Sequence, residues 1–149
     1  MLAPSLVARL RTLVGDDGVI DRPEALLVYE CDGYTLERAV PEVVVLPGTP
    51  EHVAAVVRLL AEHGIAFVPR GAGTGLSGGT LPVAAPVMVC TSRLQRIESV
   101  DVANRRITVQ AGVVNQWVTN AVRARSYNAR RFSPVLFSRP ATARAIRGW

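Results

Sequence analysis

The stretch that decides the fold reads Pro69-Arg70-Gly71-Ala72-Gly73-Thr74-Gly75-Leu76-Ser77-Gly78-Gly79 and places five glycines within the nine positions 71–79. Because glycine has no Cβ, such a backbone can take positive φ and turn successive N–H groups toward one concavity. Thr74 and Ser77 add hydroxyl donors, and Arg70 either adds charge at the rim or holds the loop in place. These eleven residues therefore predict a loop that binds phosphate oxygens. The alternative is a glycine-rich turn without a ligand.

A strand, helix and strand precede this loop. The run 42–47 is β-branched, apolar on both faces and stopped by Pro47-Gly48, which is typical of a buried strand. Thr49-Pro50 gives an N-cap and a first helical residue, and the helix is expected to end at His63-Gly64. The run 65–69 predicts a second buried strand. Connections this short around one helix are typical of parallel strands.

The glycines also fit a nicotinamide-binding fingerprint, which has to be tested. Gly73, Gly75 and Gly78 have the G-x-G-x-x-G spacing, and Glu98 lies twenty positions after the last of them. The fingerprint requires a helix that opens directly after the glycines. Residues 79–86 contain two prolines and cannot begin a long helix. The sequence therefore favours a loop that holds phosphate without a helix behind it.

The remaining elements are predicted from periodicity and turn signals. We expect helices at Ala3–Val14, Arg22–Glu30 and Val114–Arg125, and strands at Pro86–Cys90, Ile97–Val102 and Arg106–Gln110. The last two strands are expected to form a hairpin through a turn at Asn104-Arg105. Beyond residue 126 only a weak strand at Val135–Phe137 is predicted.

Composition excludes several classes of function. All 17 basic residues are arginine, so a lysine-dependent phosphate loop, a Schiff base and a catalytic lysine are ruled out. His52 and His63 lack a spaced set of carboxylates or thiolates, so no metal site is expected. Cys31 and Cys90 form no C-x-x-C pair, and the latter is expected to be a buried thiol. No apolar run reaches the length of a membrane span, no secretory signal is evident, and a cytoplasmic setting is expected.

Charge divides the chain unevenly. Residues 102–149 contain nine arginines and no acidic residue, whereas residues 1–101 carry all 12 acids. We expect one domain portion at 1–125 and, at 126–149, an aberrant or disordered basic tail of the composition that out-of-frame translation of a GC-rich gene produces. The alternative, a basic tail that binds nucleic acid, is not favoured because no aromatic interleaving or recognition motif accompanies the arginines.

Five segments, in this order along the chain, resemble the FAD-binding domain of the p-cresol methylhydroxylase type, found in the vanillyl-alcohol oxidase superfamily. They are Val43–Pro47, the helix start at Thr49–Val53, Pro69–Gly79, Arg93–Ile97 and Gln110–Val113. The resemblance covers about residues 20 to 125, and within the family it looks most like the FAD-linked subunits of glycolate oxidase and the related D-lactate dehydrogenases.

The resemblance implies a truncated α+β domain in which Arg70 to Gly79 wrap the FAD diphosphate through backbone amides, as part of an enzyme that oxidises a 2-hydroxy acid. Relatives that attach the flavin covalently from this loop use a histidine where this chain has Thr74, so the FAD is expected to be noncovalent. Substrate residues of the family lie in a C-terminal domain, so no catalytic residue is expected here. FAD and other subunits of a hydroxy-acid oxidase are the expected partners. The alternative is a non-catalytic binding fragment that needs a partner chain.

Overall fold

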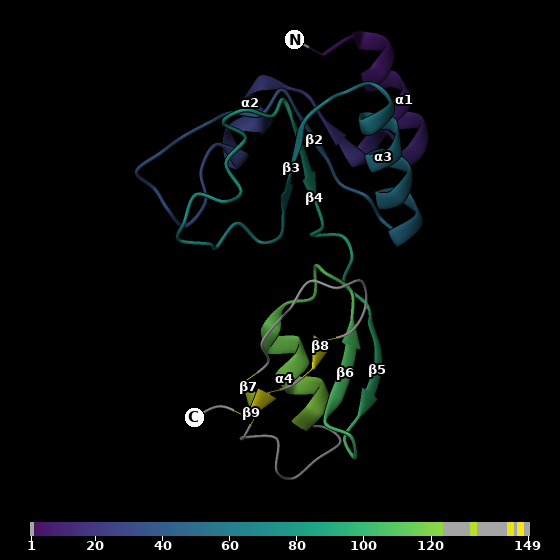
Figure 1. Cartoon of the computed structure of the whole chain (residues 1–149), viewed down its shortest axis with the longest axis vertical. Helices are drawn as coiled ribbons and strands as arrows, with labels where there is room; N and C mark the ends of the chain where they lie inside the picture. Colours follow the sequence, from purple (N-terminus) through teal and green to yellow (C-terminus); the bar gives the residue numbers. More distant parts are fainter. Residues whose placement is uncertain (1, 124–131, 134–142, 145, 148–149) are drawn as a thin grey trace. The chain divides into compact units, whose positions relative to one another are not determined.

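The computed structural model describes residues 2–123, 132–133, 143–144 and 146–147. It divides into two compact units, Met1–Arg93 and Leu94–Trp149. The first unit contains the following elements in chain order (Figure 1): α1 (Pro4–Val14), the 3₁₀ turn η1 (Asp16–Gly18), β1 (Val19–Ile20), α2 (Pro23–Leu26), the 3₁₀ turn η2 (Leu27–Tyr29), β2 (Val43–Val45), α3 (Pro50–Glu62), β3 (Phe67–Arg70) and β4 (Val87–Cys90).

A four-stranded sheet in the order β1-β2-β4-β3 forms the centre of this unit. β2 and β3 both run parallel to β4, and β1 is an antiparallel edge strand. The predicted strands are confirmed, and the strands on either side of α3 run in the same direction as expected. They are not neighbours, however, because β4 lies between them. All four residues of β4 are buried, and a strand that is apolar on both faces is most stable in the middle of a sheet.

Alternate residues of the strands face two separate cores. Val43, Val45, Val87 and Val89 pack with buried residues of α1 and α3 on one face. Val44, Met88 and Cys90 pack with Leu26 of α2 on the other. Figure 1 shows α1 and α3 side by side on their face, with α2 on the opposite side of the sheet. The sheet is thus covered by helices on both faces, and Cys90 is buried as predicted.

The helices are explained by local signals, with one exception. The hydroxyl oxygen of Thr49 accepts a hydrogen bond from the N–H of His52 at 3.2 Å, which confirms the predicted cap of α3. The second helix, predicted for residues 22–30, is wrong in extent because the α-helical part ends at Leu26 and continues as η2. Only Leu26 of this short helix is buried, whereas Leu27 and Val28 are exposed, so a longer helix would gain little from packing.

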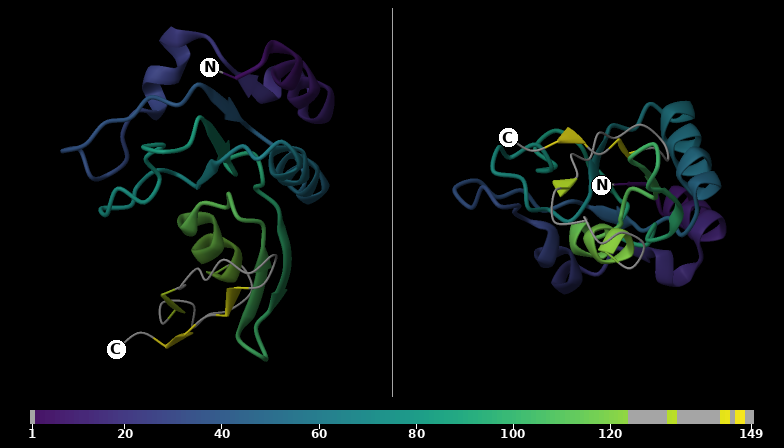
Figure 2. Two further views of the ribbon diagram at one scale, coloured as in Figure 1. Left: turned by 45° about the horizontal axis from the view of Figure 1, so that its top comes forward. Right: turned by 90° about the horizontal axis from the view of Figure 1, so that it is seen from below.

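The connection between β3 and β4 comprises residues 71–86 and contains no helix. Adjacent parallel strands need a crossover of a dozen or more residues, and this crossover is usually helical. Here the crossover from β3 to β4 contains the glycine-rich loop in place of a helix. Figure 2 shows residues 71–86 and the segment that follows η2 extending from the same edge of the sheet. Two irregular loops therefore lie together where β3 ends.

The second unit contains β5 (Ile97–Asp101), β6 (Arg106–Val109), α4 (Asn115–Arg123) and the two-residue strands β7 (Phe132–Ser133), β8 (Ala143–Arg144) and β9 (Ile146–Arg147). β5 and β6 form the predicted antiparallel hairpin, and Arg105 in its turn has a φ of 53°. Val118 of α4 packs on Ile107 and Val109 of β6. The weak strand predicted at Val135–Phe137 lies outside the described residues, and the three short strands were not predicted because two-residue ladders carry no periodic signal.

Within the described ranges, no helix combines the length and the apolar character needed to cross a membrane.

Candidate functional site

The backbone of residues 71–79 offers unpaired hydrogen-bond donors. In the part of the chain that the structure describes, none of these nine N–H groups donates a hydrogen bond to another residue. The loop also faces solvent, since all of its residues except Gly73 and Gly78 are exposed. Backbone N–H groups in native proteins are normally paired within the protein or with water or a ligand. A run of exposed N–H groups without protein partners is therefore available to bind an anion.

The glycines of the loop serve two different purposes. Gly73 and Gly78 have a φ of 69°, a conformation that other residues rarely adopt. A Cβ on Gly73 would also overlap the guanidinium group of Arg70. Gly71 and Gly79 differ, because a Cβ on either residue would meet no atom within 4 Å. The fold requires glycine at 73 and 78, whereas 71 and 79 border open space that a ligand can enter.

Arg70 closes the base of the loop. This side chain is buried at 9% relative exposure. Its Nη1 donates a hydrogen bond to the carbonyl of Cys31 at 2.9 Å and a longer one to the hydroxyl of Thr80 at 3.4 Å. The guanidinium carbon also lies 5.8 Å from the centroid of the Tyr29 ring, a cation–π distance. Of the two roles predicted for Arg70, the structure supports holding the loop in place.

Asp32 completes this arrangement. Its Oδ1 accepts a hydrogen bond from the N–H of Tyr34 at 2.8 Å, and its Oδ2 accepts one from the hydroxyl of Thr80 at 3.1 Å. Burial acts to raise the pKa of this carboxyl, but the hydrogen bonds from Tyr34 and Thr80 and the charge of Arg70 together hold the pKa below its usual value. We call Asp32, Arg70 and Thr80 the clasp. It joins the two ends of the glycine-rich loop to the segment that follows η2.

The segment after η2 was not predicted as part of the site. The pair Asp32-Gly33 follows the helix expected at residues 22–30, and Asp before Gly is also typical of a turn in which the carboxylate binds a nearby N–H. That signal predicts the bond to Tyr34. No local signal connects Asp32 with Thr80, because the two residues are 48 positions apart.

The eleven residues predicted for the site lie in two parts of the fold. Pro69 and Arg70 are the last residues of β3, so the loop begins at Gly71. Thr74, Leu76 and Ser77 are exposed on the loop, together with Ala72, Gly75 and Gly79. No helix follows Gly78 before β4, and the nicotinamide fingerprint needs one. The glycine spacing is therefore not a nicotinamide site.

Comparison with known proteins assigns the loop to a family. Residues 41–133 match the model of a family described as an FAD-binding domain. The chain belongs to this family. The chain is 37% identical over 118 residues to the glycolate oxidase subunit GlcD of Escherichia coli (strain K12), and the match covers 79% of this chain and 24% of that protein. The chain is also 35% identical over 109 residues to a D-lactate dehydrogenase of Anaerostipes hadrus. This match covers 72% of this chain and 22% of that protein.

A solved structure supports the same fold for the FAD-binding domain. The crystal structure of p-cresol methylhydroxylase with substrate bound superposes with a TM-score of 0.74 at 22% identity and covers 89% of this chain and 26% of that one. The predicted α+β fold of the p-cresol methylhydroxylase type is confirmed. The chain spans about a quarter of the length of the relatives it matches.

The donors of the FAD-binding domain suit a diphosphate. The loop supplies nine unpaired N–H groups, and at Gly71 and Gly79 no side chain stands between the backbone and solvent. Phosphate oxygens are acceptors for such convergent N–H groups. Arg70 is committed to the clasp, so the backbone dipoles are the donors that this loop presents to an anion.

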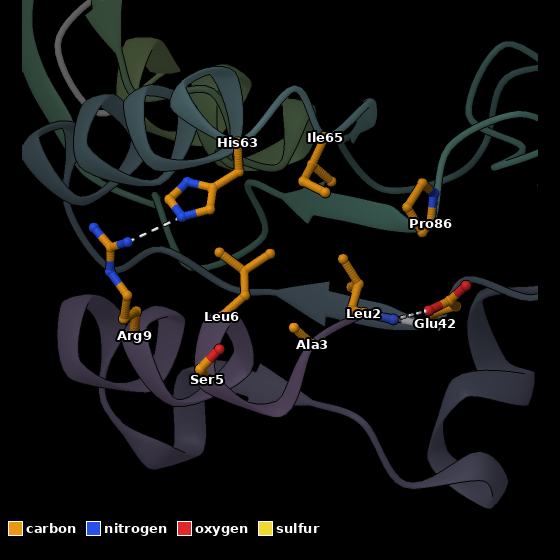
Figure 3. Close-up of a pocket in the computed structure, with 9 residues that line it drawn as sticks. All are labelled: Leu2, Ala3, Ser5, Leu6, Arg9, Glu42, His63, Ile65 and Pro86. Carbon is orange, nitrogen blue, oxygen red and sulfur yellow. Dashed lines mark hydrogen bonds between the residues drawn. The ribbon is translucent and has the colours of Figure 1, made fainter.

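A separate pocket of about 320 Å³ lies near the start of α1 (Figure 3). Arg9 contacts Nε2 of His63 at 3.1 Å at one end of it, and Glu42 accepts a hydrogen bond from the N–H of Leu2 at 2.5 Å at the other. The Nδ1 of His63 lies 2.9 Å from the carbonyl of Leu59, as expected for a histidine at the end of a helix. None of the residues predicted for the site lines this pocket.

Proposed function

We propose that residues 71–79 bind the diphosphate of FAD through their backbone N–H groups, and that the bound FAD serves the oxidation of a 2-hydroxy acid of the glycolate or D-lactate type. The run of nine N–H groups that donate to no described residue, seven of them on exposed residues, supports the binding step. The names of the relatives, a glycolate oxidase subunit and a D-lactate dehydrogenase, support the substrate class. When bound, FAD supplies the electron acceptor for this oxidation.

The residues of this chain would bind and position the cofactor, and we assign no catalytic residue to them. The chain spans about a quarter of its relatives, and the 2-hydroxy acid would be bound by sequence outside this quarter. The E. coli relative is named as a subunit, so further subunits of a hydroxy-acid oxidase are proposed as partners. The same loop would serve the alternative, a non-catalytic binding fragment that needs a partner chain.

The FAD is proposed to be held without a covalent bond. Residues 71–79 contain no histidine, cysteine or tyrosine that could attack the flavin. Thr74, at the position where covalent relatives are expected to have histidine, is an exposed residue with a weakly nucleophilic hydroxyl. Denaturing the protein after it has been loaded with FAD should therefore release the flavin and leave the mass of the polypeptide unchanged.

Titration of the full chain with FAD, followed by flavin fluorescence, tests the proposal together with the variant Gly79→Ala. A methyl group at this position meets no protein atom but would project toward an approaching diphosphate, so we expect binding to weaken about tenfold, or roughly 1.4 kcal/mol. The control is Gly48→Ala, which lies outside the loop and whose Cβ would also be uncrowded, because its nearest neighbour, Nδ1 of His52, would be 4.0 Å away. Wild-type protein that does not bind FAD would disprove the proposal. Equal affinities for wild type and Gly79→Ala would remove Gly79 from the site.

A further inference from the structure

The glycine-rich loop does not set its own shape. Its nine N–H groups make no hydrogen bond to another described residue, so nothing within residues 71–79 fixes the direction in which they point. The fixed points are the residues on either side of it. Arg70 precedes the loop and Thr80 follows it, and both bond to the segment after η2. The loop is therefore closed at its base by residues 31 and 32.

Asp32 is the centre of this closure. Its carboxylate accepts hydrogen bonds from the N–H of Tyr34 and from the hydroxyl of Thr80, while only 5% of the residue is exposed. A carboxylate with so little solvent contact is costly unless its oxygens are satisfied. These two donors and the nearby charge of Arg70 meet that requirement.

The contact at Gly33 orients the middle of the loop. A Cβ on Gly33 would lie 2.7 Å from the carbonyl oxygen of Gly75 and 2.9 Å from that of Thr74, so both carbonyls come close to this segment. In a trans peptide the N–H points opposite to the preceding C=O. With these two carbonyl oxygens against Gly33, the N–H groups of Gly75 and Leu76 would face away from Gly33.

We propose that Asp32, acting through Thr80 and Arg70, is a positioning residue that aims the N–H groups of Gly75 and Leu76 at the diphosphate of the cofactor. The cofactor site then includes residues 31–34, although the family match begins at residue 41. That the ligand is the diphosphate of FAD rests on the proposed function. The contacts that hold the loop are made within the protein and do not depend on which ligand binds.

The test compares two substitutions at Thr80 in the full chain. Thr80→Val keeps the shape of the side chain but removes the hydroxyl that joins Asp32 to Arg70, and FAD affinity should fall about tenfold. Thr80→Ser keeps the hydroxyl and should bind within about twofold of wild type. Asp32→Ala should weaken binding at least about tenfold. The control is Glu30→Ala, because this neighbouring carboxylate pairs with Arg38 outside the loop and should leave affinity unchanged.

Amide NMR spectra of the same proteins without FAD provide the second measurement. Thr80→Val should shift the resonances of Gly75 and Leu76 while α3 and β4 keep theirs, and Thr80→Ser should leave all of them in place. Unshifted resonances in Thr80→Val, or a loss of affinity that Thr80→Ser shares, would overturn the inference. If wild-type protein binds no FAD, the proposed function fails, and the resonances alone then decide whether the clasp sets the loop. If Asp32→Ala does not fold, the comparison at Thr80 decides.

Discussion

At the scale of single residues, the glycines of the loop show that one residue type serves two purposes. Gly79 borders open space, and under the proposed function its lack of a side chain leaves room for the diphosphate. Gly73 matters to the protein itself, because it combines a φ of 69° with a position directly against the guanidinium group of Arg70. A substitution at Gly73 should therefore be detected as lost stability even when no ligand is present.

The variant Gly73→Ala is expected to lower the free energy of unfolding by about 2–5 kcal/mol. The left-handed backbone conformation costs a residue with a Cβ roughly 1–2 kcal/mol, and displacing Arg70 leaves the part-buried carbonyl of Cys31 without its donor, at about 1–3 kcal/mol. Urea unfolding followed by circular dichroism measures this change. Gly71→Ala is the control, since its Cβ meets nothing within 4 Å. Two variants of equal stability would show that the contact between Arg70 and Gly73 does not hold the loop.

At the scale of secondary-structure elements, α3 shows how a local signal fixes a helix. Thr49→Ala removes the hydroxyl that accepts the N–H of His52, and the loss should cost about 1 kcal/mol of stability. The control is Thr12→Ala in the interior of α1, where the hydroxyl bonds only the carbonyl of Ala8. This change should be neutral or slightly stabilising, because alanine has the higher helix propensity. Thermal unfolding of both variants measures the difference, and a similar fall in Tm for the two would argue against the cap.

The sequence predicted the elements whose signals are local. The Thr49-Pro50 cap and the β-branched run around Val44 needed no information from elsewhere in the chain. The position of β4 between β2 and β3 could not be predicted in this way, because it depends on pairing between segments far apart in sequence. The clasp could not be predicted for the same reason, because Arg70 and the carbonyl that it binds are 39 positions apart. The glycine-rich loop could therefore be predicted from the sequence, whereas its contacts with residues 31 and 32 could not.

At the scale of the whole molecule, the residues that we propose bind and position the cofactor all belong to the first unit. Residues 1–93 contain the four-stranded sheet and two cores, one on each of its faces. The loop and all three residues of the clasp also lie within this range. A unit of this size with cores on both faces of a sheet is large enough to fold without disulfides or metals.

We therefore expect a polypeptide of residues 1–93 to fold by itself, with one cooperative thermal transition in circular dichroism. Its cores are closed by residues of the same unit, such as Leu10 of α1 and Leu60 of α3. Leu60→Ala should destabilise this polypeptide by about 2–5 kcal/mol, because the cavity it leaves is surrounded by the same buried side chains as in the full chain. Thr12→Ala is again the matched control and should leave the transition in place. A polypeptide of residues 1–93 that unfolds without a cooperative transition would show that the first unit depends on the rest of the protein for its stability.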